Sequence, residues 1–203
     1  MPHPSKCAVL GALFVWLLPA YGENPGNPAL VLALSAVSVP EIPARSAELV
    51  TAAEPSNRVQ TAVETLRTVS SIAKPGVLPY TVSAICRKNP ETAGALVAVA
   101  VGFQPQDVLV FTRAALCAAP GQVEEVVFSA CRALPALAVN VAFGACQQLP
   151  GAGDSIRAGL VRARPDMELY LEEAESKQGT NNYQTVIKQA AQLSDEAARA
   201  RAR

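Results

Sequence analysis

Histidine is almost missing from this 203-residue chain, because His3 is the only one. Serine and cysteine nucleophiles need a neighbouring base that takes up their proton, and histidine most often fills that role. Zinc sites also commonly contain histidine. The shortage therefore excludes Ser-His pairs, Cys-His pairs and the usual histidine-containing zinc sites from everything beyond the first few residues.

Other signatures of enzyme chemistry are missing as well. The chain has no GxxxxGK[ST] loop, and the glycine cluster at 151–153 lacks both the lysine and a preceding strand. Adjacent carboxylates point in different directions on a helix, so neither neighbouring pair forms an acid–base dyad; these pairs are Glu124-Glu125 and Glu172-Glu173. We expect no catalytic residue, no cofactor and no metal, and an enzyme would need groups supplied by a partner chain.

The chain also has few aromatic residues and no excess of either charge. Lysine and arginine together number 17, and so do aspartate and glutamate. A balanced charge gives no strong field towards nucleic acid, which we exclude as a partner. Half of the residues are hydrophobic but only 5% are aromatic, which indicates a core of closely packed small side chains.

What the chain does have is a period of fifteen. Proline stands at seven equally spaced positions, which are Pro75, Pro90, Pro105, Pro120, Pro135, Pro150 and Pro165. An internal period of this kind decides the fold before any single motif does. If each proline is position 1 of a unit, apolar or small residues gather at positions 4, 7, 8 and 11, as in Val108, Phe111 and Ala115. These offsets describe one face of a helix and not the alternation of a strand.

The prolines predict where each helix begins. Proline suits the first helical turn, and the residue before a proline is pushed out of the helical region. Each unit therefore has room for a helix of about eleven residues and a short reversal. Such short helices are unstable alone, so the units must bury one another's apolar faces. We predict an all-α fold, an α-solenoid or stacked array of short antiparallel helices; a β-solenoid would need an alternation that the alanine-rich units lack.

This layout resembles short-helix HEAT-type α-solenoids. It is also similar to Ala/Pro-rich helical-repeat proteins of bacterial secreted fractions that have no assigned function. The resemblance covers Pro75 to Arg164 and rests on the period and on the pattern Pro-x-x-h-x-x-h-h-x-x-Ala, in which h is apolar. It implies a helical scaffold and no particular functional residue.

The first 22 residues predict a secretory signal. Lys6 precedes an apolar stretch from Cys7 to Ala20, and Ala20 and Gly22 place small residues at the −3 and −1 positions of a cleavage site after Gly22. The stretch is shorter than the ~20 residues of a membrane-spanning helix, although an uncleaved anchor is the alternative. We therefore expect a secreted or periplasmic protein.

The rest of the chain divides into three parts. We expect residues 23–55 to be irregular, with the apolar run at 29–39 either capping the first repeat or touching a membrane. Residues 56–165 are the helical repeat domain, and its first unit is interpreted as a degenerate repeat that lacks its proline. Residues 166–203 predict a polar helical cap, with Gly179 ending one helix and residues 180–182 starting the last.

Four cysteines lie beyond the predicted signal. Position 12 extends the buried stripe and holds Cys86, Cys131 and Cys146. Cys131 and Cys146 should lie far apart at opposite ends of consecutive helices. A disulfide could join Cys86 with Cys117, or Cys117 with Cys146, only if those side chains face one another across a row. No CxxC pair supports a metal site.

Position 13 carries arginine in three units, as Arg87, Arg132 and Arg162. Alternating helix direction should place Arg132 and Arg162 on one edge of the array and Arg87 on the opposite edge. They do not form a continuous basic stripe, and each suits the negative end of its own helix.

Together these features favour an exported, non-enzymatic helical-repeat protein that acts as a protein-interaction scaffold with an unknown protein partner. The alternative is a membrane-associated or membrane-active helical protein. It rests on the run at 29–39 and on two units that are apolar nearly all round, VLVFTRAALCAA and ALAVNVAFGAC. Those units could equally form an inner row that neighbours bury on both sides.

Overall fold

The computed structural model describes residues 27–73, 75–179 and 182–202. Within these residues the chain forms eleven α-helices and no strand. The predicted signal peptide, 1–22, lies outside the described residues, so cleavage and export stay predictions. The all-α prediction is confirmed.

The fifteen-residue units have a common form, which is a three-residue 3₁₀ turn followed by an α-helix of eleven residues. Each predicted proline opens the turn, and the α-helix begins three residues later. The residue before the proline is not helical, as at Gln104 (φ −137°, ψ 76°), which is the restriction that proline imposes. The helices are α4 (Leu78–Lys88), α5 (Ala93–Phe103), α6 (Val108–Ala118), α7 (Val123–Ala133), α8 (Ala138–Gln148), α9 (Gly153–Ala163) and α10 (Glu168–Gln178).

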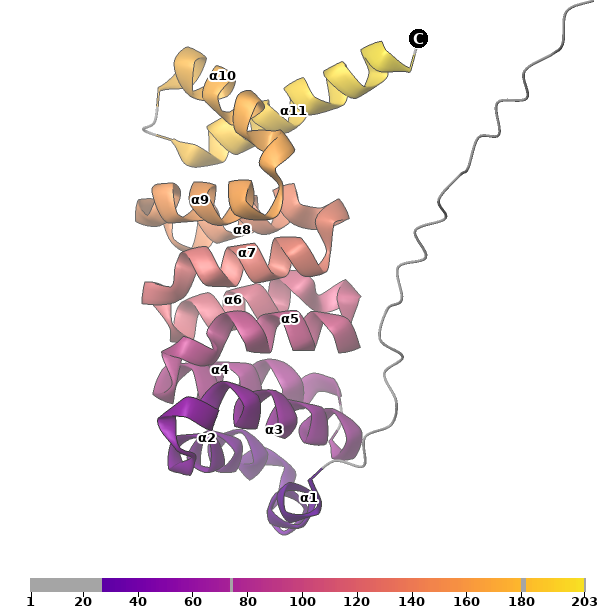
Figure 1. Cartoon of the computed structure of the whole chain (residues 1–203), viewed down its shortest axis with the longest axis vertical. Helices are drawn as coiled ribbons and strands as arrows, with labels where there is room; N and C mark the ends of the chain where they lie inside the picture. Colours follow the sequence, from indigo (N-terminus) through magenta and orange to yellow (C-terminus); the bar gives the residue numbers. More distant parts are fainter. Residues whose placement is uncertain (1–26, 74, 180–181, 203) are drawn as a thin grey trace, which may run out of the picture.

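The helices stack in two rows along the long axis of the molecule (Figure 1). The odd row contains α1 (Pro28–Ser35), α3 (Arg58–Ile72), α5, α7 and α9, and the even row contains α2 (Ile42–Ala52), α4, α6 and α8. Each helix packs on the helix two units away in its own row and on its neighbours in the other row. The direction of the chain changes by 120° between the segments that contain α7 and α8, so α8 runs back at an angle to α7.

The core runs without interruption between the two rows. One cluster of buried apolar side chains extends from Leu34 in α1 to Ala190 in the last helix. Positions 4, 7, 8, 11 and 12 supply it, and Phe111 at position 7 is its largest fully buried side chain. Burial of a Leu or Phe side chain contributes about 1.5–3 kcal/mol, so helices that are too short to form alone are held by their neighbours.

The segment at 23–55 is more regular than we expected, because its described part contains α1 and α2. Pro40 and Pro43 lie in first turns, where proline does not interrupt a helix. The following unit was also misread, since it does have its proline: Pro55 opens the turn before α3. Helix α3 has fifteen residues instead of eleven, and this extra turn shifts Pro55 out of register with Pro75.

Helix α1 packs on α3 at the end of the odd row. Leu30 and Leu34 are buried there, as expected of a capping helix, while Leu32 is 74% exposed. No single helix in the described parts of the chain is long and apolar enough to cross a membrane; two segments, Pro120–Ala133 and Pro135–Gln148, meet that criterion only as a bent pair.

The other end of the stack is closed by α10 and α11 (Tyr183–Arg201), which cross one another (Figure 1). Gly179 ends α10 with a φ of 72°, and the Asn182 side chain accepts a hydrogen bond from the backbone N–H of Thr185 at the start of α11. Helix α11 packs on both α8 and α10 and thereby continues the even row. Gln184 Nε2 donates to the carbonyl of Cys146 at 3.3 Å.

Candidate functional site

Positions 6, 9 and 13 of the repeat lie on the outside of the array, and none of the residues at these positions of α4 to α9 is buried. We call the outer surface of α4, α6 and α8 the even-row face. It holds Tyr80, Ser83, Arg87, Val110, Arg113, Cys117, Asn140, Phe143 and Gln147. We call the matching surface of α5, α7 and α9 the odd-row face. It holds Ala95, Ala98, Gly102, Glu125, Phe128, Arg132, Ser155, Ala158 and Arg162.

On the odd-row face, Arg162 is paired with glutamates of a neighbouring helix, whereas Arg132 has no ion pair among the described residues and contacts the Phe128 ring of its own helix. Arg162 on α9 donates hydrogen bonds to Glu124 at 3.3 Å and to Glu125 at 2.8 Å on α7. Its guanidinium carbon lies 3.6 Å from the centre of the Phe128 ring, in a cation–π contact. The hydrogen bond that Arg162 donates to Glu125 and the attraction of both carboxylates raise the pKa of Arg162. These glutamates therefore neutralise an arginine across two helices.

The predicted placement of the position-13 arginines is consistent with the structure. Arg132 lies 5.8 Å from the centre of the same Phe128 ring that Arg162 covers, so the two arginines share one edge. Arg87 lies in the even row, on the other side of the array. The three arginines form no common stripe.

The odd-row helices also approach one another closely at two glycines. A Cβ atom on Gly94 of α5 would lie 2.7 Å from Glu125 Cγ, and one on Gly159 of α9 would lie 2.6 Å from the carbonyl oxygen of Glu124. Both distances are too short for carbon side chains, so α5, α7 and α9 pack at a separation that only glycine permits. By contrast, a Cβ atom on Gly144 in the even row would meet Leu109 at 3.7 Å, an ordinary contact.

The even-row face is apolar and basic. Its exposed apolar side chains include Tyr80, 72% exposed, and Val110, 49% exposed. Helices α4, α6 and α8 contain no aspartate or glutamate and three cations, Arg87, Lys88 and Arg113. Among the residues that the structure describes, none of these cations has an ion pair or a side-chain hydrogen bond. This face therefore offers positive charge without internal neutralisation.

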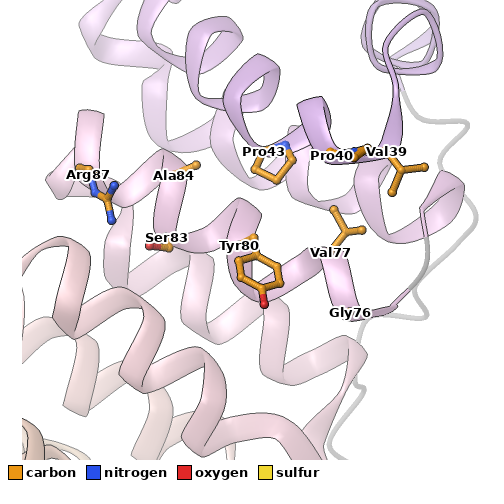
Figure 2. Close-up of a pocket in the computed structure, with 9 residues that line it drawn as sticks. All are labelled: Val39, Pro40, Pro43, Gly76, Val77, Tyr80, Ser83, Ala84 and Arg87. Atoms are coloured by element: carbon orange, nitrogen blue, oxygen red, sulfur yellow. The ribbon is translucent and has the colours of Figure 1, made fainter.

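A groove of about 540 Å³ lies between α2 and α4 on this side of the molecule (Figure 2). Its lining is mostly apolar and consists of Val39, Pro40, Pro43, Gly76, Val77, Tyr80, Ser83, Ala84 and Arg87. Arg87 lies at one end, and Gly76 and Val39 lie at the other, with the Tyr80 ring between them (Figure 2). The arrangement can hold an elongated apolar group and offer a cation to one end of it.

A second groove, of about 260 Å³, lies between α6 and α8. Leu109 and Arg113 of α6 line it together with Gly144 and Gln147 of α8. Position 13 of its second helix is Gln147, where the first groove has Arg87. The second groove is therefore smaller, and its cation is Arg113 of its first helix instead of an arginine at position 13 of its second.

The four described cysteines are free thiols. Burial raises the pKa of Cys86 and Cys131 to about 12 and that of Cys146 to about 11, so these thiols stay protonated and unreactive at neutral pH. Cys117 is exposed. The candidate disulfide among Cys86, Cys117 and Cys146 is not formed here, because position 13 turns Cys117 outwards while position 12 holds the other two in the core.

The sequence carried a signal for the even-row face that its interpretation missed. Tyr80 and Arg87 stand at the outward positions 6 and 13, and α4, α6 and α8 contain no acidic residue. The grooves themselves depend on contact between helices that are not consecutive, such as α2 and α4. In the described ranges, no group of three or more His, Cys, Asp or Glu residues could hold a metal ion.

Comparisons with protein-family models, with curated proteins and with solved structures gave no match to this chain, so its function has to be inferred from the surfaces described above.

Proposed function

We propose that the protein is an exported, non-enzymatic helical-repeat scaffold, similar to short-helix HEAT-type solenoids, that binds another protein through its even-row face. The observation that carries the proposal is the difference between the two faces. Arg162 of the odd row is neutralised by Glu124 and Glu125, whereas Arg87 and Arg113 of the even row have no ion pair among the described residues. Unpaired cations beside exposed apolar side chains are suited to a partner of opposite charge.

The same face supports the alternative, a protein that rests on an anionic membrane. Three cations and exposed side chains such as Tyr80 and Val110 would attract lipid headgroups. Each cation near an anionic surface contributes only about 1 kcal/mol, and stable attachment needs more than one strong signal. The grooves favour a protein, because concave apolar sites fit side chains better than they fit a flat lipid surface.

A site-specific cross-linking experiment tests the proposal. A photo-reactive amino acid is placed at Val110 on the even-row face or, as a matched control, at Ala158 on the odd-row face of the full chain in its native cells. We expect a discrete protein adduct from position 110 and none from position 158. Equal adducts from both positions, or none from position 110, would contradict the proposal, and an adduct with lipid alone would favour the membrane alternative.

Export is tested separately by the N-terminus of the cellular protein. A chain that begins at Glu23 in the envelope or medium is the expected result. A chain that still begins at Met1 and stays in the cytoplasm would contradict export.

A further inference from the structure

The geometry points to the groove between α2 and α4 as a binding site for an extended apolar peptide segment of the partner, whose C-terminal carboxylate is held by Arg87. This inference rests on the proposed function, since it names the chemistry of the partner that the even-row face binds. It is a more specific claim, however, because it assigns one groove, one charged contact and one direction of the bound segment.

The apolar part of the groove is built from both helices. Pro40 in the 3₁₀ turn before α2 and Pro43 in the first turn of α2 face Val77, in the turn before α4, and Tyr80 of α4. Proline and tyrosine rings are rigid, so they lose little conformational freedom when a ligand covers them. A volume of about 540 Å³ lies within the range of ligand-binding sites, which are usually apolar with a few placed polar groups.

The length of the groove fits a short extended peptide. Gly76 and Arg87 mark its two ends and are eleven residues apart, which corresponds to about 16 Å along a helix. An extended chain advances about 3.3 Å per residue, so roughly five residues span the groove. Tyr80 is seven residues before Arg87, which corresponds to about 10 Å along the helix. An apolar side chain of the bound peptide that contacts Tyr80 would therefore lie about three residues before the C-terminal carboxylate.

Arg87 supplies the recognition of charge. The guanidinium group matches a carboxylate with two parallel hydrogen bonds, and it is more weakly hydrated than a lysine ammonium. In the described structure Arg87 has no ion pair, and α4 carries no acidic residue that could compete. Glu48, the one carboxylate of α2, is paired with Arg45 at 3.2 Å. The Ser83 hydroxyl beside Arg87 is a further donor at this end of the groove.

The groove between α6 and α8 provides an internal contrast. It also lies between two neighbouring even-row helices, but position 13 of its second helix is Gln147 instead of arginine, and the volume is about 260 Å³. A neutral amide does not attract a carboxylate from solution as a guanidinium does. The α6–α8 groove does contain Arg113, but at position 9 of its first helix and in about half the volume, so we expect carboxylate-terminated peptides to select the α2–α4 groove, where Arg87 stands at one end.

The test uses two synthetic probes and the full chain. The probes are acetyl-Leu-Pro-Leu-Val-Ala with a free C-terminal carboxylate and the same peptide as a carboxamide, and binding is followed by chemical-shift changes of backbone amides. We expect the carboxylate to bind about tenfold more tightly, with changes confined to 39–43 and 76–87. Arg87→Gln should remove this preference and leave the affinity for the carboxamide unchanged, and Tyr80→Ser should weaken both probes by the same factor.

The matched control is Arg113→Gln, which removes a cation from the same face outside this groove and should change neither affinity. Equal affinities of the two probes for the wild-type chain would overturn the inference, and so would changes centred on the α6–α8 groove. Sodium laurate is the third probe: if laurate binds with dependence on Arg87 while neither peptide binds, the site takes a free amphiphile and the peptide assignment is wrong.

The outcomes separate this inference from the proposed function. If cross-linking at Val110 gives a protein adduct but the peptides do not bind, the groove assignment alone fails. If the carboxylate peptide binds with dependence on Arg87 but Val110 gives no adduct, the groove assignment is supported and the docking of a protein on the even-row face fails. Circular dichroism of each variant confirms that the helices are intact.

Discussion

The two rows of helices are built from the same fifteen-residue unit but present opposite surfaces. In the odd row, Gly94 and Gly159 let α5, α7 and α9 approach closely, and the hollow of about 280 Å³ between α7 and α9 is polar, because Glu124, Glu125 and their partner Arg162 line it. The even row is open, with grooves between its helices and with Arg87 and Arg113 unpaired among the described residues. Because both rows fill the same inward positions, the difference resides in the other ones: positions 5 and 10, where Gly94 and Gly159 lie, and the outward positions 6, 9 and 13.

This difference shows that the residues shared by all units determine the helical scaffold. The residues that differ from unit to unit determine the surface. Position 10 illustrates the point, because Gly144 and Gly159 occupy it in adjacent units. In the odd row the missing side chain admits the backbone of a neighbouring helix, whereas in the even row it leaves room beside Leu109. The same residue at the same position thus closes one row and opens a groove in the other.

The largest expected effect is the loss of stability when a large side chain is removed from an inward position, compared with the same removal at an outward position. Phe111 at position 7 of α6 is fully buried, and Phe143 at position 9 of α8 is only partly buried. Phe111→Ala should lower the free energy of unfolding by about 3–5 kcal/mol, because it leaves a cavity in the core. Phe143→Ala should cost clearly less. Similar losses in urea-induced unfolding would show that position 9 also belongs to the core.

The next effect compares the rows directly at position 10. Gly159→Ala should destabilise the fold by about 1–3 kcal/mol, because its Cβ would lie 2.6 Å from the backbone oxygen of Glu124. Gly144→Ala should instead stabilise it by about 0.5–1 kcal/mol, since alanine is the better helix former and 3.7 Å is an ordinary contact. Urea unfolding of both variants measures the two values. Equal shifts would contradict the difference in packing between the rows.

A smaller effect concerns the charges. Arg162→Gln should lower the thermal midpoint slightly, because Glu124 and Glu125 then lose the cation that both contact. The loss should shrink as salt is added, since these groups are exposed and salt screens them. Arg113→Gln on the even-row face should leave the midpoint unchanged at every salt concentration. A loss for Arg113→Gln as large as that for Arg162→Gln would mean that the even-row cations are also paired.

The smallest effect lies where α11 joins the stack. The Tyr183 phenol donates a hydrogen bond to Asp154 of α9, and this bond raises the pKa of Tyr183 to about 12. The unfolded value is about 10, so the protonated phenol stabilises the fold below pH 10 and this contribution is lost as the pH rises towards 12. Tyr183→Phe should lose less stability than the wild type between pH 10 and 12.

The buried thiols also lose protons in this range, but they are present in both proteins and cancel in the difference. Thermal melts of both proteins from pH 8 to 12 give the comparison. Parallel curves would show that the Tyr183–Asp154 bond contributes nothing.

Much of the fold followed from the sequence, because the period fixed helix length, helix start and the buried stripe. The two failures have local causes. Pro55 was missed because α3 is four residues longer than its neighbours, so its proline breaks the period. The irregularity expected around Pro40 and Pro43 was wrong because proline in a first turn begins a helix.

The surfaces could not be derived in the same way. The contact between Arg162 and Glu124 joins residues that are 38 positions apart, and the groove between α2 and α4 needs the pairing of alternate helices. Periodicity shows which residues point outwards, but the partners of those residues depend on the spacing of the rows. Single residues such as Gly94 and Gly159, which are glycine where other units carry a side chain, set that spacing.

The most direct test of the account is the effect of one reversed charge on each face. Val110 cross-linking is measured in the wild type, in Arg113→Glu on the even-row face and in Arg132→Glu on the odd-row face. The account predicts that Arg113→Glu strongly reduces the protein adduct and that Arg132→Glu leaves it at the wild-type level. An adduct that is insensitive to Arg113→Glu, or equally sensitive to both changes, would contradict the assignment of docking to the even-row face.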